Sequence, residues 1–119
     1  MGTSPSLRVA RVEPAAPEPP LQVTVLVSSG QAVVALDGDV DVTAAPLLAA
    51  AARDLAATGA PVVVDASGVR FMDCAGLRAV TDLAVDCSGV TVRNPSPAVR
   101  WLLELAGGAA VRVDVGRSA

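Results

Sequence analysis

Three consecutive valines at residues 62–64 constrain the fold more than any other part of the sequence. A continuous apolar run of β-branched residues is typical of an interior parallel strand, because such a strand is buried on both faces. Residues 65–68 include Asp, Ser and Gly and predict a turn, after which the apolar side chains among residues 69–72 return the chain to the core. Residues 73–77 predict the start of a helix, where free N–H groups and the helix dipole favour anionic groups. We therefore expect the functional site where this strand meets this helix.

Length and composition predict a single globular domain that binds protein. The chain has 119 residues, enough for one core, and 52% of them are hydrophobic, with one Trp, one Phe and no Tyr. A net charge of −3 with scattered arginines argues against a surface for nucleic acid or for an anionic membrane. No apolar run approaches the roughly 18 residues of a membrane span, and no signal peptide is indicated. We therefore expect a cytoplasmic protein.

The order of strand and helix patterns predicts an α/β fold. Residues 1–20 are rich in proline and predict a flexible leader, residues 21–115 one domain, and residues 116–119 a short tail. The alternation over residues 21–36 predicts an opening β-hairpin, and three helices then alternate with strands in the order β-β-α-β-α-β-α-β. Crossovers between parallel strands are right-handed. We therefore expect a mixed, mostly parallel sheet with helices packed on it.

Polar residues mark the expected loops and helix starts. Residues 37–41 predict a loop out of the hairpin, Thr43 predicts a side-chain N-cap for the first helix, and Ser96 predicts one for the last helix. Trp101 and Leu105 lie about one helical turn apart. They either cover the edge of the sheet or form a patch for a second copy or another partner.

The residue types argue against catalysis and against a metal site. The sequence has no His, Lys or Tyr, so only carboxylates and thiols could act as general acids or bases, and it has no glycine-rich phosphate loop. Asp37, Asp39 and Asp41 alternate like calcium ligands, but Val42 and Leu48 occupy the positions of the required glycine and bidentate glutamate. We expect no enzyme activity, no cofactor and no metal ion.

The two cysteines, Cys74 and Cys87, are too few for a disulfide framework. Cys74 lies at a helix start, where the dipole favours the reactive thiolate, although Asp73 opposes it. It either has a redox role or is a small residue in a place where serine would also fit. A helix of 13 residues would hold the two cysteines roughly 20 Å apart, whereas a disulfide needs Cα atoms within about 7 Å. We therefore expect no internal disulfide.

Three motifs in order make the chain resemble a known family. They are G-D-V-D-V-T-A-A-P-L-L at residues 38–48, V-V-V-D-A-S-G-V-R-F-M-D-C-A-G-L at residues 62–77, and V-R-N-P-S-P-A-V-R-W-L-L-E-L-A-G-G at residues 92–108. With these motifs the chain resembles the STAS domain, the sulfate transporter and anti-sigma factor antagonist family. With no transporter segment attached, it is similar to a stand-alone bacterial anti-sigma factor antagonist.

The resemblance implies a switch position. In this family the motif D-S-[ST]-G-L carries a serine that a partner anti-sigma factor, itself a serine kinase, phosphorylates. Asp73, Gly76 and Leu77 match the motif, whereas Cys74 stands at the phosphoacceptor position and Ala75 follows it. Neither of these two residues can be phosphorylated as a serine.

The resemblance also implies a partner-binding surface and a function. Asp39 and Asp41 fall in the family's G-[ED]-x-D loop, which contacts the kinase. Thr43 and Met72 belong to the same surface, and Leu77 is expected to be an apolar anchor.

The favoured hypothesis is an anti-sigma factor antagonist that binds a kinase-fold anti-sigma factor, frees a sigma factor, and is not controlled by phosphorylation at Cys74. The alternatives are a STAS subunit of an ABC-type lipid transporter, docked on an ATPase, and a thiol-based redox sensor that uses Cys74. Either a monomer or a weak dimer fits the sequence.

Overall fold

The computed structural model describes residues 21–28, 30–106 and 108–114, so the predicted leader and tail lie outside the described residues. Strands and helices follow the predicted order β-β-α-β-α-β-α-β. They are β1 (Gln22–Ser28), β2 (Gln31–Val40), α1 (Ala44–Thr58), β3 (Val62–Met72), α2 (Cys74–Asp86), β4 (Val90–Arg93), α3 (Pro97–Ala106) and β5 (Val111–Asp114).

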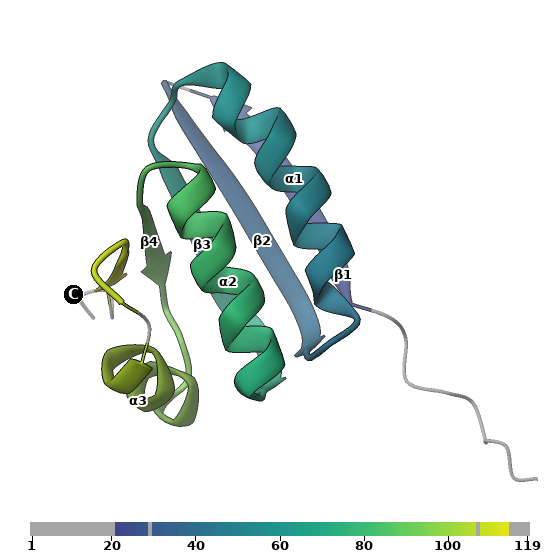
Figure 1. Ribbon diagram of the computed structural model, residues 1–119, viewed down its shortest axis with the longest axis vertical. Coiled ribbons are helices and arrows are strands. Elements are labelled where there is room, and N and C mark those ends of the chain that lie inside the picture. The colour runs from purple at the N-terminus through teal and green to yellow at the C-terminus, as the bar shows by residue number, and fades with distance from the viewer. Residues whose placement is uncertain (1–20, 29, 107, 115–119) are drawn as a thin grey trace, which may run out of the picture.

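The strands form one mixed sheet in the order β1-β2-β3-β4-β5. β1 runs antiparallel to β2, and each later pair of neighbours is parallel. β3 is therefore the central strand, as predicted, and its valines at residues 62–64 are all buried. Figure 1 shows α1 and α2 side by side across one face of the sheet. Both helices begin at the same end of the sheet, because the strands that precede them are parallel.

Aliphatic side chains between the helices and the sheet form the core. Every second residue of β2 from Ala32 to Val40 is buried, which is the period of a strand with one covered face. Leu48 and Leu55 of α1 and Leu83 of α2 pack onto that face. Burying a Val or Leu side chain fully is worth roughly 1.5–3 kcal/mol, so these contacts hold α1 and α2 in place.

The helix starts match the prediction at α3 but not at α1. The Val99 N–H donates to the Ser96 hydroxyl at 3.3 Å, as expected of an N-cap. The Thr43 side chain makes no cap bond to α1, so its prediction as an N-cap is wrong. The longest described helix is α1 with 15 residues, and no described helix is long and apolar enough to cross a membrane.

β2 and β3 are both longer than predicted. The expected loop at residues 37–41 and turn at residues 65–68 are wrong, because β2 continues to Val40 and β3 to Met72. The two segments pair with each other through two register shifts, at each of which β3 has an extra residue. Such bulges keep polar residues and glycine within a sheet. These extensions carry β2 and β3 to the predicted site.

Candidate functional site

The ends of β2 and β3 bring the two predicted site segments together. Val40 lies opposite Met72 in the sheet, and the Asp73 N–H donates to the Val40 carbonyl oxygen at 3.3 Å. Residues 38–43 and residues 72–77 therefore form one surface, which we call the corner. It lies where α1 and α2 begin, at the lower end of the sheet in Figure 1.

Gly76 determines how closely α2 approaches β2. A Cβ atom at this position would overlap the backbone carbonyl group of Val40, and it would also press on the Val40 side chain. The φ angle of Gly76 is not positive, so the glycine is needed for lack of a side chain and not for its backbone freedom. Any larger residue must push α2 away from the end of β2.

Asp73 caps α2, a role that the sequence analysis did not assign to it. Its backbone is extended, and its Oδ1 accepts a hydrogen bond from the Gly76 N–H at 2.8 Å. Such a cap satisfies a backbone donor that the helix leaves unpaired, and its loss costs about 1 kcal/mol. Cys74 is then the first residue of α2 and is exposed, while Met72 and Ala75 are half-buried. The corner therefore presents Cys74 to solvent from a fixed helix start.

The Asp41 carboxylate orders the other half of the corner. Its Oδ1 accepts hydrogen bonds from the Thr43 hydroxyl at 2.6 Å and from the Thr43 N–H at 3.0 Å. These bonds, chiefly the one from the hydroxyl, hold the pKa of Asp41 below its ordinary value, because they favour the ionised form. Asp41 and Thr43 thus stabilise the loop together before any partner binds.

Asp39 of the corner forms an exposed ion pair with Arg70. Its Oδ1 lies 3.6 Å from Nη2 of Arg70, and both side chains are partly exposed. A pair of this kind contributes at most about 1 kcal/mol to stability. Throughout the part of the chain that the structure describes, no three carboxylate or thiol groups gather in a way that could hold a metal ion.

Leu77, which the family resemblance led us to expect as an apolar anchor, offers little surface to a partner. Only 7% of it is exposed, and it packs in the hydrophobic core. The exposed apolar side chains at the corner are instead Val42, 68% exposed in the loop, and Phe71, 51% exposed next to Met72. These two residues are the ones that a partner could cover.

The sequence predicts that Phe71 is buried, because the bulge in β3 is not evident from the sequence. In a regular strand Val69 and Phe71 would share a face, yet Val69 is buried and Phe71 is exposed. The register shift adds Arg70 between the residues that pair with Gly38 and Asp39, and a shift of one residue reverses the face of a side chain. No local pattern signalled the exposure of Phe71, because the same strand buries consecutive apolar residues at 62–64.

The two cysteines lie at opposite ends of α2, and both are free. Burial, reinforced by the negative charge of Asp86, raises the pKa of the half-buried Cys87 thiol and so keeps it protonated. The length of α2 separates Cys87 from Cys74, as the sequence predicts. A redox role for Cys74 stays a prediction.

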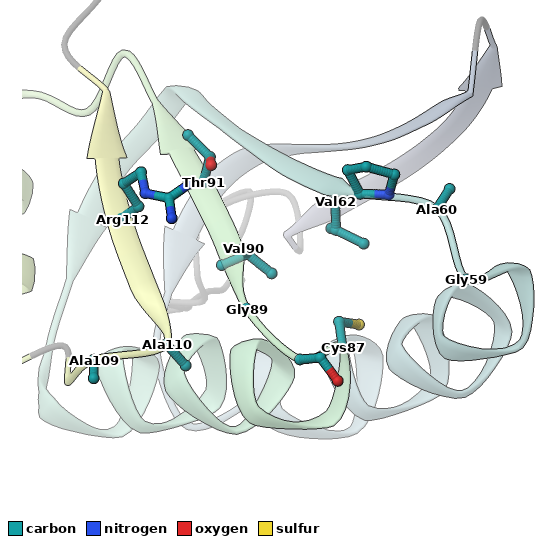
Figure 2. A pocket seen from close by; sticks show the side chains of 12 residues that line it. Gly59, Ala60, Val62, Cys87, Gly89, Val90, Thr91, Ala109, Ala110 and Arg112 are labelled. Carbon is teal, nitrogen blue, oxygen red and sulfur yellow. The ribbon is translucent and has the colours of Figure 1, made fainter.

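A pocket of about 430 Å³ lies at the end of the sheet opposite the corner. Gly59, Val62 and Cys87 line it, and Figure 2 shows the Cys87 side chain facing the opening between α1 and β3. Arg112 is the one charged residue in the lining and lies beside Thr91. No residue of the corner lines this pocket, so the two features are separate.

Comparison with models of protein families gives a match that spans most of the chain. The family model described as "Mlab, STAS domain" matches residues 24–116, a range of 93 of the 119 residues that includes the whole corner. None of the curated proteins compared with the chain matches it.

Solved structures with the same fold include several anti-sigma factor antagonists. One from Mycobacterium paratuberculosis is 28% identical, with 73% of this chain and 78% of that one covered and a TM-score of 0.63. The anti-sigma factor antagonist SpoIIAA in its unphosphorylated form is 19% identical, with coverage of 82% and 89% and a TM-score of 0.61. The Bacillus cell fate determinant SpoIIAA in the phosphorylated form is 21% identical, with coverage of 79% and 90% and a TM-score of 0.58. At these identities the two SpoIIAA structures show only that the fold is shared.

The contact between Gly76 and Val40 predicts a large effect of one added methyl group. Gly76→Ala should lower the free energy of unfolding by about 2–3 kcal/mol, because the new Cβ meets backbone atoms that cannot move independently. Urea denaturation followed by circular dichroism measures this change. Val85→Ile adds one carbon at an exposed position of the same helix and should change stability by no more than about 0.5 kcal/mol. Equal stability of the two variants would mean that α2 does not approach β2 this closely.

Proposed function

The chain belongs to the STAS domain family, and we propose that within it this protein is an anti-sigma factor antagonist. It binds an anti-sigma factor of the serine-kinase fold and so releases a sigma factor for transcription. The similarity to the anti-sigma factor antagonist from Mycobacterium paratuberculosis, at 28% identity, supports this proposal.

The observation that carries the proposal is the joined surface of the corner. Two segments far apart in the sequence meet there through the Val40 backbone, and the exposed side chains of Val42, Phe71 and Cys74 lie on or beside them. Exposed apolar groups next to a polar rim are typical of surfaces that bind protein. In this proposal Val42 and Phe71 take the anchoring role that the sequence assigned to Leu77, and Asp39, Asp41 and Thr43 form the rim.

Cys74 sets the regulatory state in this proposal. A phosphoserine carries about −1.5 to −2 charges near neutral pH. In a packed contact with another protein, this charge either binds a cationic group or weakens the contact through repulsion and loss of water. The thiol of Cys74 is exposed, lacks the hydroxyl that a serine kinase phosphorylates, and brings no such charge. Cys74 therefore keeps the protein in its binding-competent form without control by phosphorylation at this position.

The alternative that the sequence left open is a second function, and membership of the STAS domain family is compatible with it. In that function the protein is a STAS subunit of an ABC-type lipid transporter, and the corner docks on the transporter's ATPase. The same exposed groups would then face an ATPase in place of a kinase fold.

Affinity purification of the full chain from its native cells, followed by mass spectrometry, separates the two functions. We expect to recover a small protein of the serine-kinase fold, which would be the anti-sigma factor. Recovery of an ABC-type ATPase with membrane components would overturn the favoured function and support the second. The Gly76→Ala variant serves as the control, since a partner that binds the corner should be depleted when α2 is displaced from Val40.

Charge at Cys74 predicts a graded effect on binding to the purified partner. Cys74→Ser should bind like wild type and regain a hydroxyl that can accept phosphate. Cys74→Asp should bind at least about tenfold more weakly, or about 1.4 kcal/mol, because Asp73 already places one negative charge beside this position. A negative charge in the first turn favours the helix itself, so the loss should not reflect unfolding.

Titration calorimetry under reducing conditions measures these affinities, with circular dichroism to check that each variant is folded. Ala109→Asp is the matched control, because it adds the same charge at an exposed residue beside the pocket at the other end of the sheet. It should leave the affinity unchanged. Equal affinities for wild type and Cys74→Asp would place the contact surface elsewhere, and a stable phosphate ester on the wild-type protein would place the acceptor at another residue.

A further inference from the structure

The two edges of the sheet are protected very differently. β5 forms one edge with only four residues, and two of these are the charged Arg112 and Asp114. β1 forms the other edge with seven residues, Q-V-T-V-L-V-S, and contains no charge and no proline. It also pairs with β2 along its whole length without a register shift. Short length, charges, prolines and bulges are the devices that keep a free edge from pairing with another strand, and β1 has none of them.

The side chains of β1 are also unusually exposed for their type. Val25, Leu26 and Val27 are 40%, 61% and 58% exposed. Val25 lies opposite the buried Val34 and so faces the helix side, whereas Leu26 lies opposite the half-buried Val33 and faces the other side of the sheet. Apolar groups are therefore exposed on both faces of the same free edge. A pairing strand would cover both faces at once.

We propose that β1 pairs antiparallel with β1 of a second copy of this chain, joining two sheets into one across a two-fold axis. The strand is self-complementary in this arrangement. The register that pairs all seven residues sets Val25 opposite Val25 of the second copy, Val23 opposite Val27, and Thr24 opposite Leu26. Directly opposite side chains share a face of the sheet, so valines meet valines on the helix side, Leu26 meets Thr24 on the other side, and no like charges face each other.

The size of the contact sets the strength of the dimer. Seven residues from each copy are far fewer than the roughly 20–30 residues a side of a standard stable interface. The dimer is therefore weak and forms at micromolar concentrations and above. A two-fold axis through β1 also reverses β2 and β3 of the second copy, so the two corners lie at opposite ends of the joined sheet. Each corner stays free to bind its own partner molecule.

Sedimentation velocity of the full chain tests the proposal, because association follows mass action. Between about 10 and about 500 µM, the average mass of wild type should rise from 11.8 kDa toward twice that value. Val25→Lys should stay monomeric over the whole range, since two lysines would meet at the axis. Val85→Lys is the matched control, an exposed valine on α2, and should associate like wild type. Circular dichroism checks that the variants are folded.

A mixture of two variants makes the test specific for the axis. Val25→Glu alone should also be monomeric, whereas an equal mixture with Val25→Lys should regain the dimer, because opposite charges then face each other. A wild-type protein that stays monomeric at every concentration would overturn the proposal. A dimer that persists in both single variants would place the contact on another surface and would equally overturn it.

Discussion

The close contact between Gly76 and the Val40 carbonyl group is the constraint on which the functional surface depends. It lets the first turn of α2 lie against the end of β2, where the Asp73 N–H also bonds to Val40. Because β2 and β3 are parallel neighbours, their carboxyl ends lie together at one end of the sheet. The aliphatic core beneath α1 and α2 holds both helices against the sheet. The protein's own backbone thus joins two distant segments of sequence into one surface before any partner is present.

The polar groups of this surface are already engaged, which decides what is left for a partner. The Asp73 carboxylate caps α2, the Asp41 carboxylate holds Thr43, and Asp39 pairs with Arg70. A partner would therefore gain chiefly from covering the exposed apolar side chains and the neutral thiol of Cys74, because burial of apolar area is the main favourable term in protein association. A phosphate at the same place would have to lose water without an evident partner among these groups.

Much of this architecture could be predicted from the sequence. The valines at residues 62–64 place β3 in the middle of the sheet, and the polar residue before each of α2 and α3 locates the helix start. The errors arise where local signals and tertiary pairing disagree. Gly68 is typical of a turn, yet long-range pairing with β2 keeps it in a bulged strand. The same bulges exchange the faces of neighbouring side chains, which is why Phe71 is exposed. Leu77 is buried because α2 approaches β2 so closely at Gly76, a distance that no local pattern encodes.

The central claim is that a partner protein binds the corner. Amide chemical shifts of the isotope-labelled full chain, recorded during titration with the purified partner, test it most directly. The account predicts that the largest changes fall on the corner, residues 38–43 and 72–77, and on the neighbouring Phe71, with little change on β1, α3 or the pocket around Cys87. Changes concentrated on any of those other surfaces, with residues 71–77 unaffected, would contradict it.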